Sequence, residues 1–202
     1  MTPAKMLALL DAPAHMSTVC GIEKSCSPTP RCSIGSTYPV VDFDTIKDEF
    51  YKARKQRSKS SVDALATNPA GDKLLLVEIK SWQLAIKHPV TNEFIDPEAI
   101  APIATKFITK LAKKVRESYE IFIEVAGDPN VMDTLPTAVI FVSDLPTDPV
   151  AMLAGNLNML AAFPTDYTRR CNDLTRLELD KLPDMKTYYA ACHEFDGLIA
   201  QL

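Results

Sequence analysis

Residues 74–80, with the sequence LLLVEIK, most constrain what this chain can fold into. The run is apolar and unbroken up to Glu78, which is typical of a strand buried on both faces of a sheet. Side chains alternate along a strand, so Glu78 and Lys80 project to one side and Ile79 to the other. A charged pair therefore enters a buried layer, which is costly unless the charges are paired or bound to a metal.

A second strand is expected just upstream, at residues 61–66. Residues 67–72 contain an Asn-Pro and a Gly-Asp pair, and both favour a turn because proline fixes φ and glycine frees it. The two strands and this turn predict a hairpin. In that hairpin Asp63 is able to face Glu78 and Lys80, so three charged side chains converge on one spot.

A helix is expected at residues 44–57, with Asp44 as its N-cap and acidic residues in its early turns. The residues at positions i, i+3, i+4 and i+7 of its inward stripe are Ile46, Glu49, Phe50 and Ala53. Glu49 therefore belongs to the apolar stripe in this interpretation. A second carboxylate is expected to approach the hairpin from a packed helix.

A helical Glu, then an Asp, then a hydrophobic-Glu-x-Lys run resembles the PD-(D/E)xK nuclease superfamily over roughly residues 44–142. The resemblance implies that Asp63 and Glu78 ligate a divalent metal, Mg²⁺ or Mn²⁺, and that the Ile79 carbonyl adds a ligand. Hard oxygen ligands suit such a metal, which polarises the scissile phosphate. The resemblance also implies that Lys80 positions or activates the attacking water.

The same resemblance gives Glu49 a contact with the metal through water. It also implies a helix residue, Gln or Lys, after the Lys strand, for which Gln83, Lys106 and Lys110 are the alternatives. The implied activity is that of a Mg²⁺-dependent nuclease or endonuclease, a hydrolase that cleaves phosphodiester bonds of DNA or, as the second choice, RNA.

The implied fold class is α/β, with a small mixed central sheet flanked by helices. A restriction-endonuclease-like core is expected at residues 43–145, an N-terminal extension with a Cys-containing loop at 1–42, and a C-terminal helical addition at 146–202, all in one domain. Family members place a strand between the helical acid and the Asp. Because only residues 58–61 remain for it, either the helix is shorter, or the strand is missing or comes from elsewhere, such as residues 37–41.

The charged motif also has simpler interpretations. A buried strand that surfaces through Glu-x-Lys gives a solvated ion pair, which is the ordinary fate of such charges. The main rival keeps the fold without the chemistry, as a non-catalytic nucleic-acid-binding or assembly module. Such a module would be a subunit of a larger complex, with the acids in structural ion pairs. Whichever interpretation holds, the expected partners are nucleic acid and either a second copy, in a homodimer, or the other subunits of a larger complex.

Length and composition set outer limits. The 202 residues, 47% of them hydrophobic, are enough for one sizeable core. No apolar run approaches the ~18 residues that span a bilayer, and residues 6–10 lack the basic flank and length of a secretory signal. We therefore expect a cytoplasmic protein without a membrane partner.

The net charge of −4 argues against bulk coating of nucleic acid, although local basic patches can still bind phosphates. The first such patch, expected to guide nucleic acid, consists of Lys52, Arg54, Lys55, Arg57 and Lys59. A second stripe, at positions i, i+4 and i+7 of a later helix, consists of Lys106, Lys110 and Lys113. This second stripe is interpreted as a solvated helix face.

A loop-like stretch near the N-terminus offers a second metal site. Its four soft or borderline ligands are His15, Cys20, Cys26 and Cys32, which are able to hold Zn²⁺. An iron-sulfur cluster that uses Cys171 and Cys192 as distal partners is another alternative. The third is that these cysteines are small buried hydrophobic residues.

Proline, glycine and polar residues mark the ends of helices and strands, and their positions predict the remaining elements. Helices are expected at residues 2–11, 96–125, 147–162 and 183–200, strands at 137–143 and 175–179, and a loop at 12–39.

Overall fold

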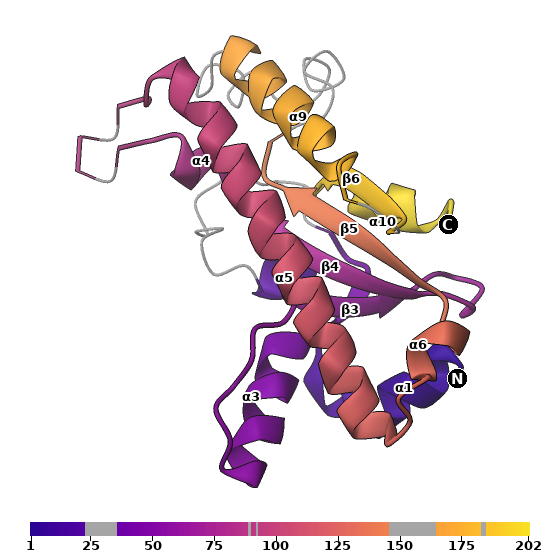
Figure 1. Cartoon of the computed structure of the whole chain (residues 1–202). Coiled ribbons are helices and arrows are strands. Elements are labelled where there is room, and N and C mark those ends of the chain that lie inside the picture. Colours follow the sequence, from indigo (N-terminus) through magenta and orange to yellow (C-terminus); the bar gives the residue numbers. More distant parts are fainter. Residues whose placement is uncertain (23–35, 89, 92, 146–164, 183–184) are drawn as a thin grey trace.

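The computed structural model describes residues 1–22, 36–88, 90–91, 93–145, 165–182 and 185–202. Within them the chain is a mixed α/β fold in which helices flank a six-stranded mixed sheet (Figure 1). The strands are β1 (Met16–Thr18), β2 (Pro39–Asp42), β3 (Ala64–Thr67), β4 (Leu74–Lys80), β5 (Thr137–Ser143) and β6 (Thr187–Ala191). The helices are α1 (Pro3–Leu9), η1 (Ala12–His15), α2 (Val19–Ile22), α3 (Phe43–Arg54), α4 (Trp82–Ala85), η2 (Pro97–Ala99), α5 (Ile100–Ala126), α6 (Val131–Thr134), α9 (Thr165–Leu179) and α10 (Phe195–Ile199), of which η1 and η2 are 3₁₀ helices.

The strands lie side by side in the order in which they occur in the chain. Strands β1 to β4 pair antiparallel, whereas β4, β5 and β6 pair parallel. Parallel neighbours need a crossover, and α5 supplies it between β4 and β5. Strands β1, β2 and β6 lie outside the core expected at residues 43–145 but belong to the same sheet.

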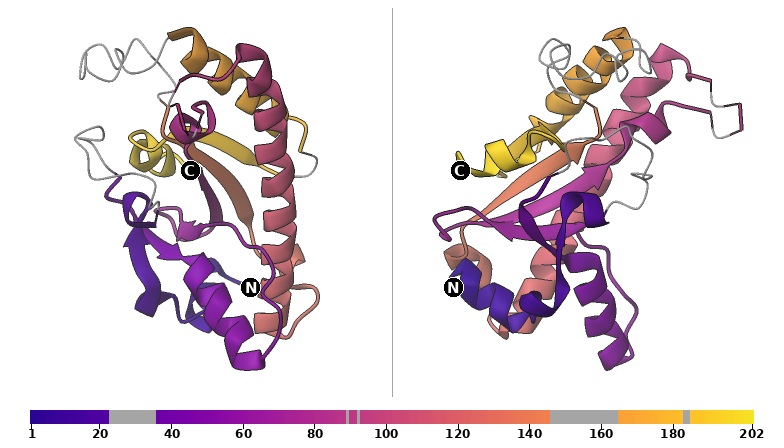
Figure 2. Two further views of the ribbon diagram at one scale, coloured as in Figure 1. Left: turned by 90° about the vertical axis from the view of Figure 1, so that its left-hand side faces the viewer. Right: turned by 180° about the vertical axis from the view of Figure 1, so that it is seen from behind.

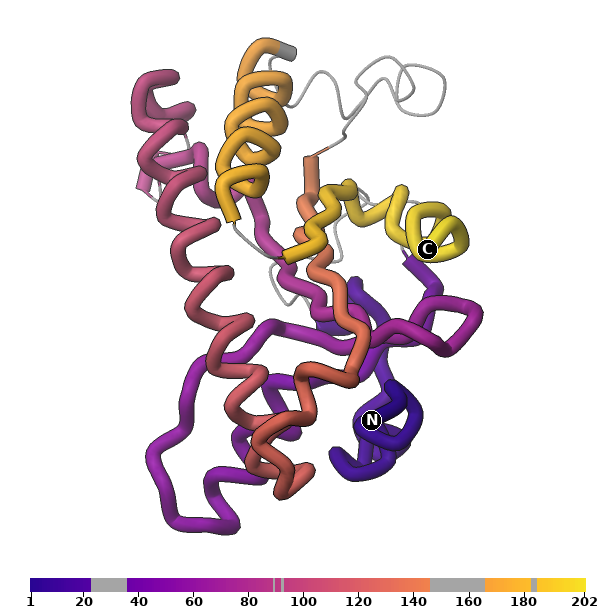
Figure 3. Tube along the Cα trace, turned by 45° about the vertical axis from the view of Figure 1, so that its right-hand side comes forward, coloured from indigo at the N-terminus to yellow at the C-terminus, as the bar shows by residue number. Residues whose placement is uncertain are grey.

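The two faces of the sheet bury different clusters, as the alternation along β4 shows. Leu74 and Leu76 belong to the cluster that α5 covers, while Leu75 and Val77 pack with residues of α10 on the opposite face. Figure 2 shows α5 and α10 on these opposite faces, and the trace in Figure 3 shows α9 beside α5. By this alternation Glu78 and Lys80 face α5.

The predicted hairpin of β3 and β4 is confirmed. Ala64 pairs with Val77, and the ladder runs to Thr67 and Leu74. In the turn, the Asn68 side-chain oxygen accepts hydrogen bonds from the main-chain amides of Asp72 and Lys73. Gly71 has a φ of 69°, a conformation in which a side chain would be strained.

The missing strand comes from upstream of the helix. Strand β2 pairs antiparallel with β3 and precedes α3, close to the alternative at residues 37–41. Helix α3 ends at Arg54, three residues before the expected end, because Lys55 adopts a left-handed φ of 55° and its amide hydrogen-bonds back to the helix. The following segment then runs directly to β3.

The long helix α5 begins after Asp96 and Pro97, as predicted, although a short 3₁₀ turn precedes it. Pro102 lies in its first turn, where no helical hydrogen bond is lost. Gly127 ends the helix with a left-handed φ of 64°, and its amide donates to the Ile123 carbonyl.

The C-terminal region differs from expectation. Residues 175–179, predicted as a strand, are the last turns of α9, where the Thr175 hydroxyl donates to the Cys171 carbonyl one turn earlier. The helix predicted at residues 183–200 is instead strand β6 followed by α10. β6 contains two tyrosines and pairs with β5, so sheet pairing outweighs its weak helical pattern. The helix expected at residues 147–162 lies outside the described residues.

The N-terminal helix was predicted, but residues 12–22 are not a plain loop. They form η1, β1 and α2, and β1 extends the sheet by pairing with β2. In the described part of the chain, no helix combines the length and apolar character that crossing a membrane requires.

Candidate functional site

Asp63, Glu78 and Lys80 lie together under α5. The Lys80 Nζ is 2.6 Å from Glu78 Oε1 and 3.5 Å from Asp63 Oδ2. Hairpin pairing causes this convergence, because Asp63 lies across from Glu78 in the register that joins Ala64 to Val77. The geometric expectation from the sequence therefore matches the structure.

The main chain fixes Asp63 at the edge of the hairpin. Its Oδ2 accepts a hydrogen bond of 2.7 Å from the Ile79 amide, and its carbonyl accepts one from the Phe43 amide. The carboxylate thus takes the place of a strand partner at the point where β3 begins. This local arrangement keeps the Asp63 side chain beside Glu78.

A fourth charged residue, Lys114 of α5, completes the cluster and was missed in the sequence. Its Nζ donates to Asp63 Oδ1 at 2.6 Å and to Glu78 Oε2 at 3.0 Å. A signal was present, because Lys114 lies seven residues after Phe107 and directly before the buried Val115, at the border of the apolar stripe. We call Asp63, Glu78, Lys80 and Lys114 the charged cluster.

Burial governs the electrostatics of the charged cluster. Glu78 is fully buried, and this burial, together with the nearby charge of Asp63, raises its pKa to about 7 despite the two lysines. Burial alone would lower the pKa of Lys114, but the charges of Glu78 and Asp63 outweigh it and hold that pKa above its ordinary value. Two carboxylates and two ammonium groups thus balance each other.

One oxygen of Glu78 is incompletely satisfied. Oε1 is buried and lies 2.6 Å from Lys80 Nζ and 3.0 Å from Lys114 Nζ, but neither contact has hydrogen-bond geometry. The charges of Lys80 and Lys114 therefore hold this oxygen in place.

The Lys80 ammonium lies among three oxygen atoms. Besides Glu78 Oε1 and Asp63 Oδ2, it donates to the Ile79 carbonyl at 2.8 Å. These are the three groups that the sequence resemblance implied as metal ligands. They are hard oxygen donors of the kind that Mg²⁺ prefers, so the donor set fits that ion once the lysine side chain moves aside.

Glu49 does not join the charged cluster. Its side chain is 65% exposed, and it lies 3.5 Å from the His15 ring nitrogen Nε2. The buried residues of α3 are Phe43, Ile46 and Tyr51. The inward stripe therefore follows a different phase from the one expected, and the prediction that Glu49 approaches the hairpin is wrong.

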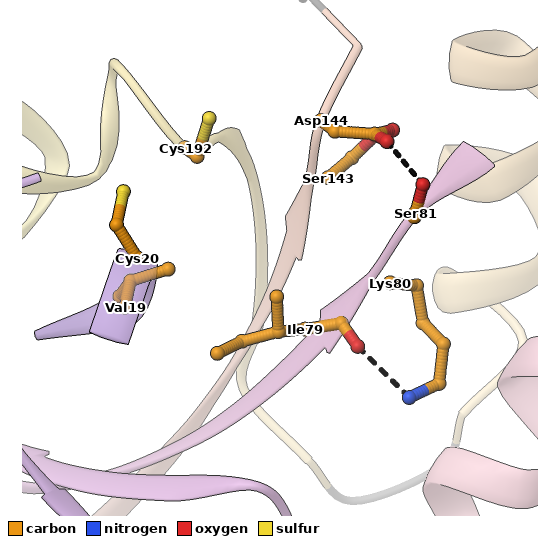
Figure 4. Close-up of a pocket in the computed structure, with 8 residues that line it drawn as sticks. All are labelled: Val19, Cys20, Ile79, Lys80, Ser81, Ser143, Asp144 and Cys192. Atoms are coloured by element: carbon orange, nitrogen blue, oxygen red, sulfur yellow. Dashed lines mark hydrogen bonds between the residues drawn. The ribbon is translucent and has the colours of Figure 1, made fainter. Parts of the chain in front are cut away.

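The second metal site predicted near the N-terminus is described only in part, because Cys26 and Cys32 lie outside the described residues. His15 lies 3.5 Å from the Glu49 carboxylate. Cys20 lines a small pocket together with Cys192, at the ends of β4 and β5 (Figure 4). Within the described ranges, no three His, Cys, Asp or Glu side chains gather as metal ligands.

Asp144 lines the same pocket and holds the chain where β4 ends. Its carboxylate accepts hydrogen bonds from the Ser81 hydroxyl and from the main-chain amides of Trp82 and Gln83, at 2.8 and 3.3 Å for the amides (Figure 4 shows the first). Burial raises the pKa of Asp144 to about 6 against these hydrogen bonds. The Gln83 side chain donates to the Asp144 carbonyl.

The basic patch expected to guide nucleic acid lies far along α3. Ser61 donates to Asp44 at the start of α3, so the ten residues from there to Arg54 run about 15 Å away from that end. Lys59 is neutralised by Glu120 and Glu124, at 3.1 and 2.8 Å. The other members, Lys52, Arg54, Lys55 and Arg57, are exposed.

No known family model, curated protein or solved structure matches this chain.

Proposed function

We propose that this chain is a Mg²⁺-dependent nuclease, able to use Mn²⁺, that hydrolyses phosphodiester bonds of DNA, with RNA as the second choice. The observation that carries the proposal is the Lys80 ammonium, which lies within 3.5 Å of oxygens from Asp63, Glu78 and Ile79. A cation already occupies the centre of an oxygen donor set beside a second lysine, Lys114.

In the proposed reaction, Asp63, Glu78 and the Ile79 carbonyl hold the metal. Such a metal would polarise the scissile phosphate and lower the pKa of a coordinated water molecule. Lys114 keeps the two carboxylates together and partly balances their charge. Neither Glu49 nor Gln83 takes part, because both are engaged elsewhere.

Lys80 has the second role in this proposal. It has to leave the three oxygens for a metal to enter, and its side chain is long and 23% exposed. Its ammonium charge is then free to orient the attacking water and to stabilise the negative charge that develops on the phosphate.

The test measures cleavage of plasmid DNA and of an RNA strand with Mg²⁺ or Mn²⁺. Glu78→Gln and Lys80→Met are expected to lower the cleavage rate on the order of 100-fold or more, because each removes a charged group from the reaction. The matched control is Lys181→Met, which changes a surface lysine paired with Glu178 and should cut normally. The proposal is contradicted if the natural protein cleaves neither substrate, or if Glu78→Gln and Lys80→Met cleave as fast as the natural protein.

Metal binding gives a readout apart from cleavage. Removing the Lys80 ammonium vacates the three oxygens, so Lys80→Met should bind Mn²⁺ more tightly than the natural protein while cleaving less. Mn²⁺ binding followed by electron paramagnetic resonance checks this. Equal or weaker binding by Lys80→Met would show that the ammonium does not compete with a metal.

One observation favours the non-catalytic alternative, an assembly or nucleic-acid-binding module. The charged cluster is closed without a metal, since its two lysines balance its two carboxylates. A metal that binds the folded chain at 100 times its dissociation constant adds about 2.7 kcal/mol to the free energy of unfolding. If saturating Mg²⁺ leaves urea unfolding unchanged, the structural alternative is favoured.

A further inference from the structure

Helix α5 has a strongly uneven charge along its length. From residue 105 to 116 it carries five basic side chains and no acidic one, in a protein of net charge −4. The basic residues are Lys106, Lys110, Lys113, Lys114 and Arg116. The acidic residues follow them, at Glu117, Glu120 and Glu124. The charge changes sign between Arg116 and Glu117, less than one turn after Lys114, the residue that joins the charged cluster.

Three of the lysines form one row on this helix. Lys106, Lys110 and Lys114 are spaced by four residues, and each such step rises about 6 Å along the axis. Rows of this spacing are inclined to the helix axis, so they wind from one face toward another. Exposure follows the row, because Lys106 and Lys110 are exposed while Lys114 is 21% exposed. We call Lys106 and Lys110 the α5 ridge, and its inner end reaches the charged cluster through Lys114.

Within the described ranges, neighbouring acids do not neutralise the charge of the α5 ridge. Among the residues that the structure describes, Lys106 and Lys110 form no ion pair, and the nearby Lys113 is 3.7 Å from Glu117. Lys47 and Lys59, by contrast, each lie within 3.3 Å of two acids. Unpaired lysines that lead toward a phosphodiester site suit a polyanion.

The opposite direction from the charged cluster is unsuitable for phosphates. There Glu117 accepts a hydrogen bond from the Ser60 amide, and Glu120 and Glu124 take up the charge of Lys59. A strand that leaves the site on that side would meet carboxylates.

We propose that the α5 ridge binds the phosphates of a nucleic-acid strand on one side of the scissile phosphate. The inference rests on the proposed function for the identity of that site, but not for the binding itself. It assigns the main backbone contacts to α5 instead of the basic patch at the end of α3. The partner is a phosphodiester backbone, held by point charges without reading of bases.

The experiment measures binding of a fluorescein-labelled oligodeoxynucleotide, single-stranded and as a duplex, by anisotropy over a range of salt concentrations. A chelator is present, so no cleavage occurs. The variant Lys106→Gln/Lys110→Gln is compared with the charge-matched control Lys52→Gln/Arg57→Gln, which alters exposed residues of the other patch.

The α5 variant should bind on the order of 10-fold more weakly at 0.1 M salt. The slope of log affinity against log salt should fall by about 1.4 for a single strand, because two phosphate contacts are lost. The control should keep the natural slope. Circular dichroism and urea unfolding verify that both variants fold.

The inference is overturned if the control loses as much affinity as the α5 variant, if neither loses any, or if the natural protein binds neither form of DNA. The inference is also overturned if polyglutamate of equal total charge displaces the labelled oligonucleotide as strongly as unlabelled DNA does. The two proposals fail separately. If the natural protein cleaves and the α5 variant binds DNA normally, only the proposal about the α5 ridge is refuted. If binding depends on the α5 ridge but no cleavage occurs, only the proposed nuclease activity is refuted.

Discussion

The carboxyl group of Glu78 has no exposed surface, and its charge is balanced by Lys80 and Lys114. Transfer of an ionised carboxylate from water into a protein interior costs several kcal/mol, which paired charges offset only in good geometry. The raised pKa of about 7 expresses this cost, because burial is its largest cause. At this single residue, stability and the proposed chemistry therefore oppose each other.

A pH titration of stability tests this balance. The folded pKa of Glu78 lies near 7 and its unfolded value near 4.5, so between these values the folded state binds the proton more strongly. The contribution of Glu78 is fully present below about pH 4.5 and is lost as the pH rises to about 7, on the order of 3 kcal/mol. Glu78→Gln should remove this loss. Urea unfolding of both proteins from pH 5 to 8 checks it, and parallel curves for the two would contradict it.

The residues of the charged cluster were predictable to different degrees. Asp63, Glu78 and Lys80 follow from local rules, since alternation along a strand and one turn place them on the same face. Glu49 was misplaced because the phase of a helix stripe depends on what the helix packs against. Lys114 comes from a helix 36 residues after Glu78, and its approach depends on how α5 crosses the sheet.

At the scale of elements, Asp144 connects β5 to the end of β4. Its carboxylate binds three groups at the start of α4, which holds the chain just after Lys80. The same short helix contains Trp82, the only tryptophan of the chain. Trp82 is buried, packs edge-on against Phe107 of α5, and donates to the Thr175 hydroxyl of α9. Its fluorescence therefore reports the packing of these three helices.

Asp144→Ala should loosen α4. Loss of a capping carboxylate costs about 1 kcal/mol, and two amides at the start of the helix lose their acceptor. The free energy of unfolding should fall by about that amount or more, and the Trp82 emission should shift to longer wavelength as water reaches the indole. The control is Asp166→Ala at an exposed site of α9. An unchanged emission with unchanged stability would show that Asp144 does not hold α4.

Long, strongly patterned elements could be predicted, and short ones set by pairing could not. The apolar runs of β4 and β5 and the stripe of α5 carry their own signal over 7, 7 and 27 residues. Strand β6 has only five residues, and its state is decided by pairing with β5. The last turns of α9 alternate in the sequence like a strand, but the preceding helix continues through them.

At the scale of the whole molecule, the charged cluster lies on the face of the sheet that α5 covers, next to a large apolar cluster. On that face, Leu74, Leu76 and Phe141 pack in one cluster with the buried residues of α5. A chain that needed only stability could fill the same space with apolar side chains, because replacement of buried ion pairs by hydrophobic residues is often neutral or stabilising by about 1 to 4 kcal/mol. Retention of four charges there is the pattern expected of a functional site.

Replacement of the whole charged cluster tests this view. In the variant Asp63→Asn, Glu78→Leu, Lys80→Met and Lys114→Leu, no charge is left unpaired, and the amide side chain introduced at position 63 keeps an oxygen for the Ile79 amide. We expect its free energy of unfolding at pH 7 to equal or exceed that of the natural protein, while cleavage and Mn²⁺ binding disappear. The single variant Lys114→Leu is the comparison, because it leaves two carboxylates with one lysine and should lose about 3 kcal/mol. If the fourfold variant is less stable than this single variant, the four charges are needed for folding, and their retention is no sign of a functional site.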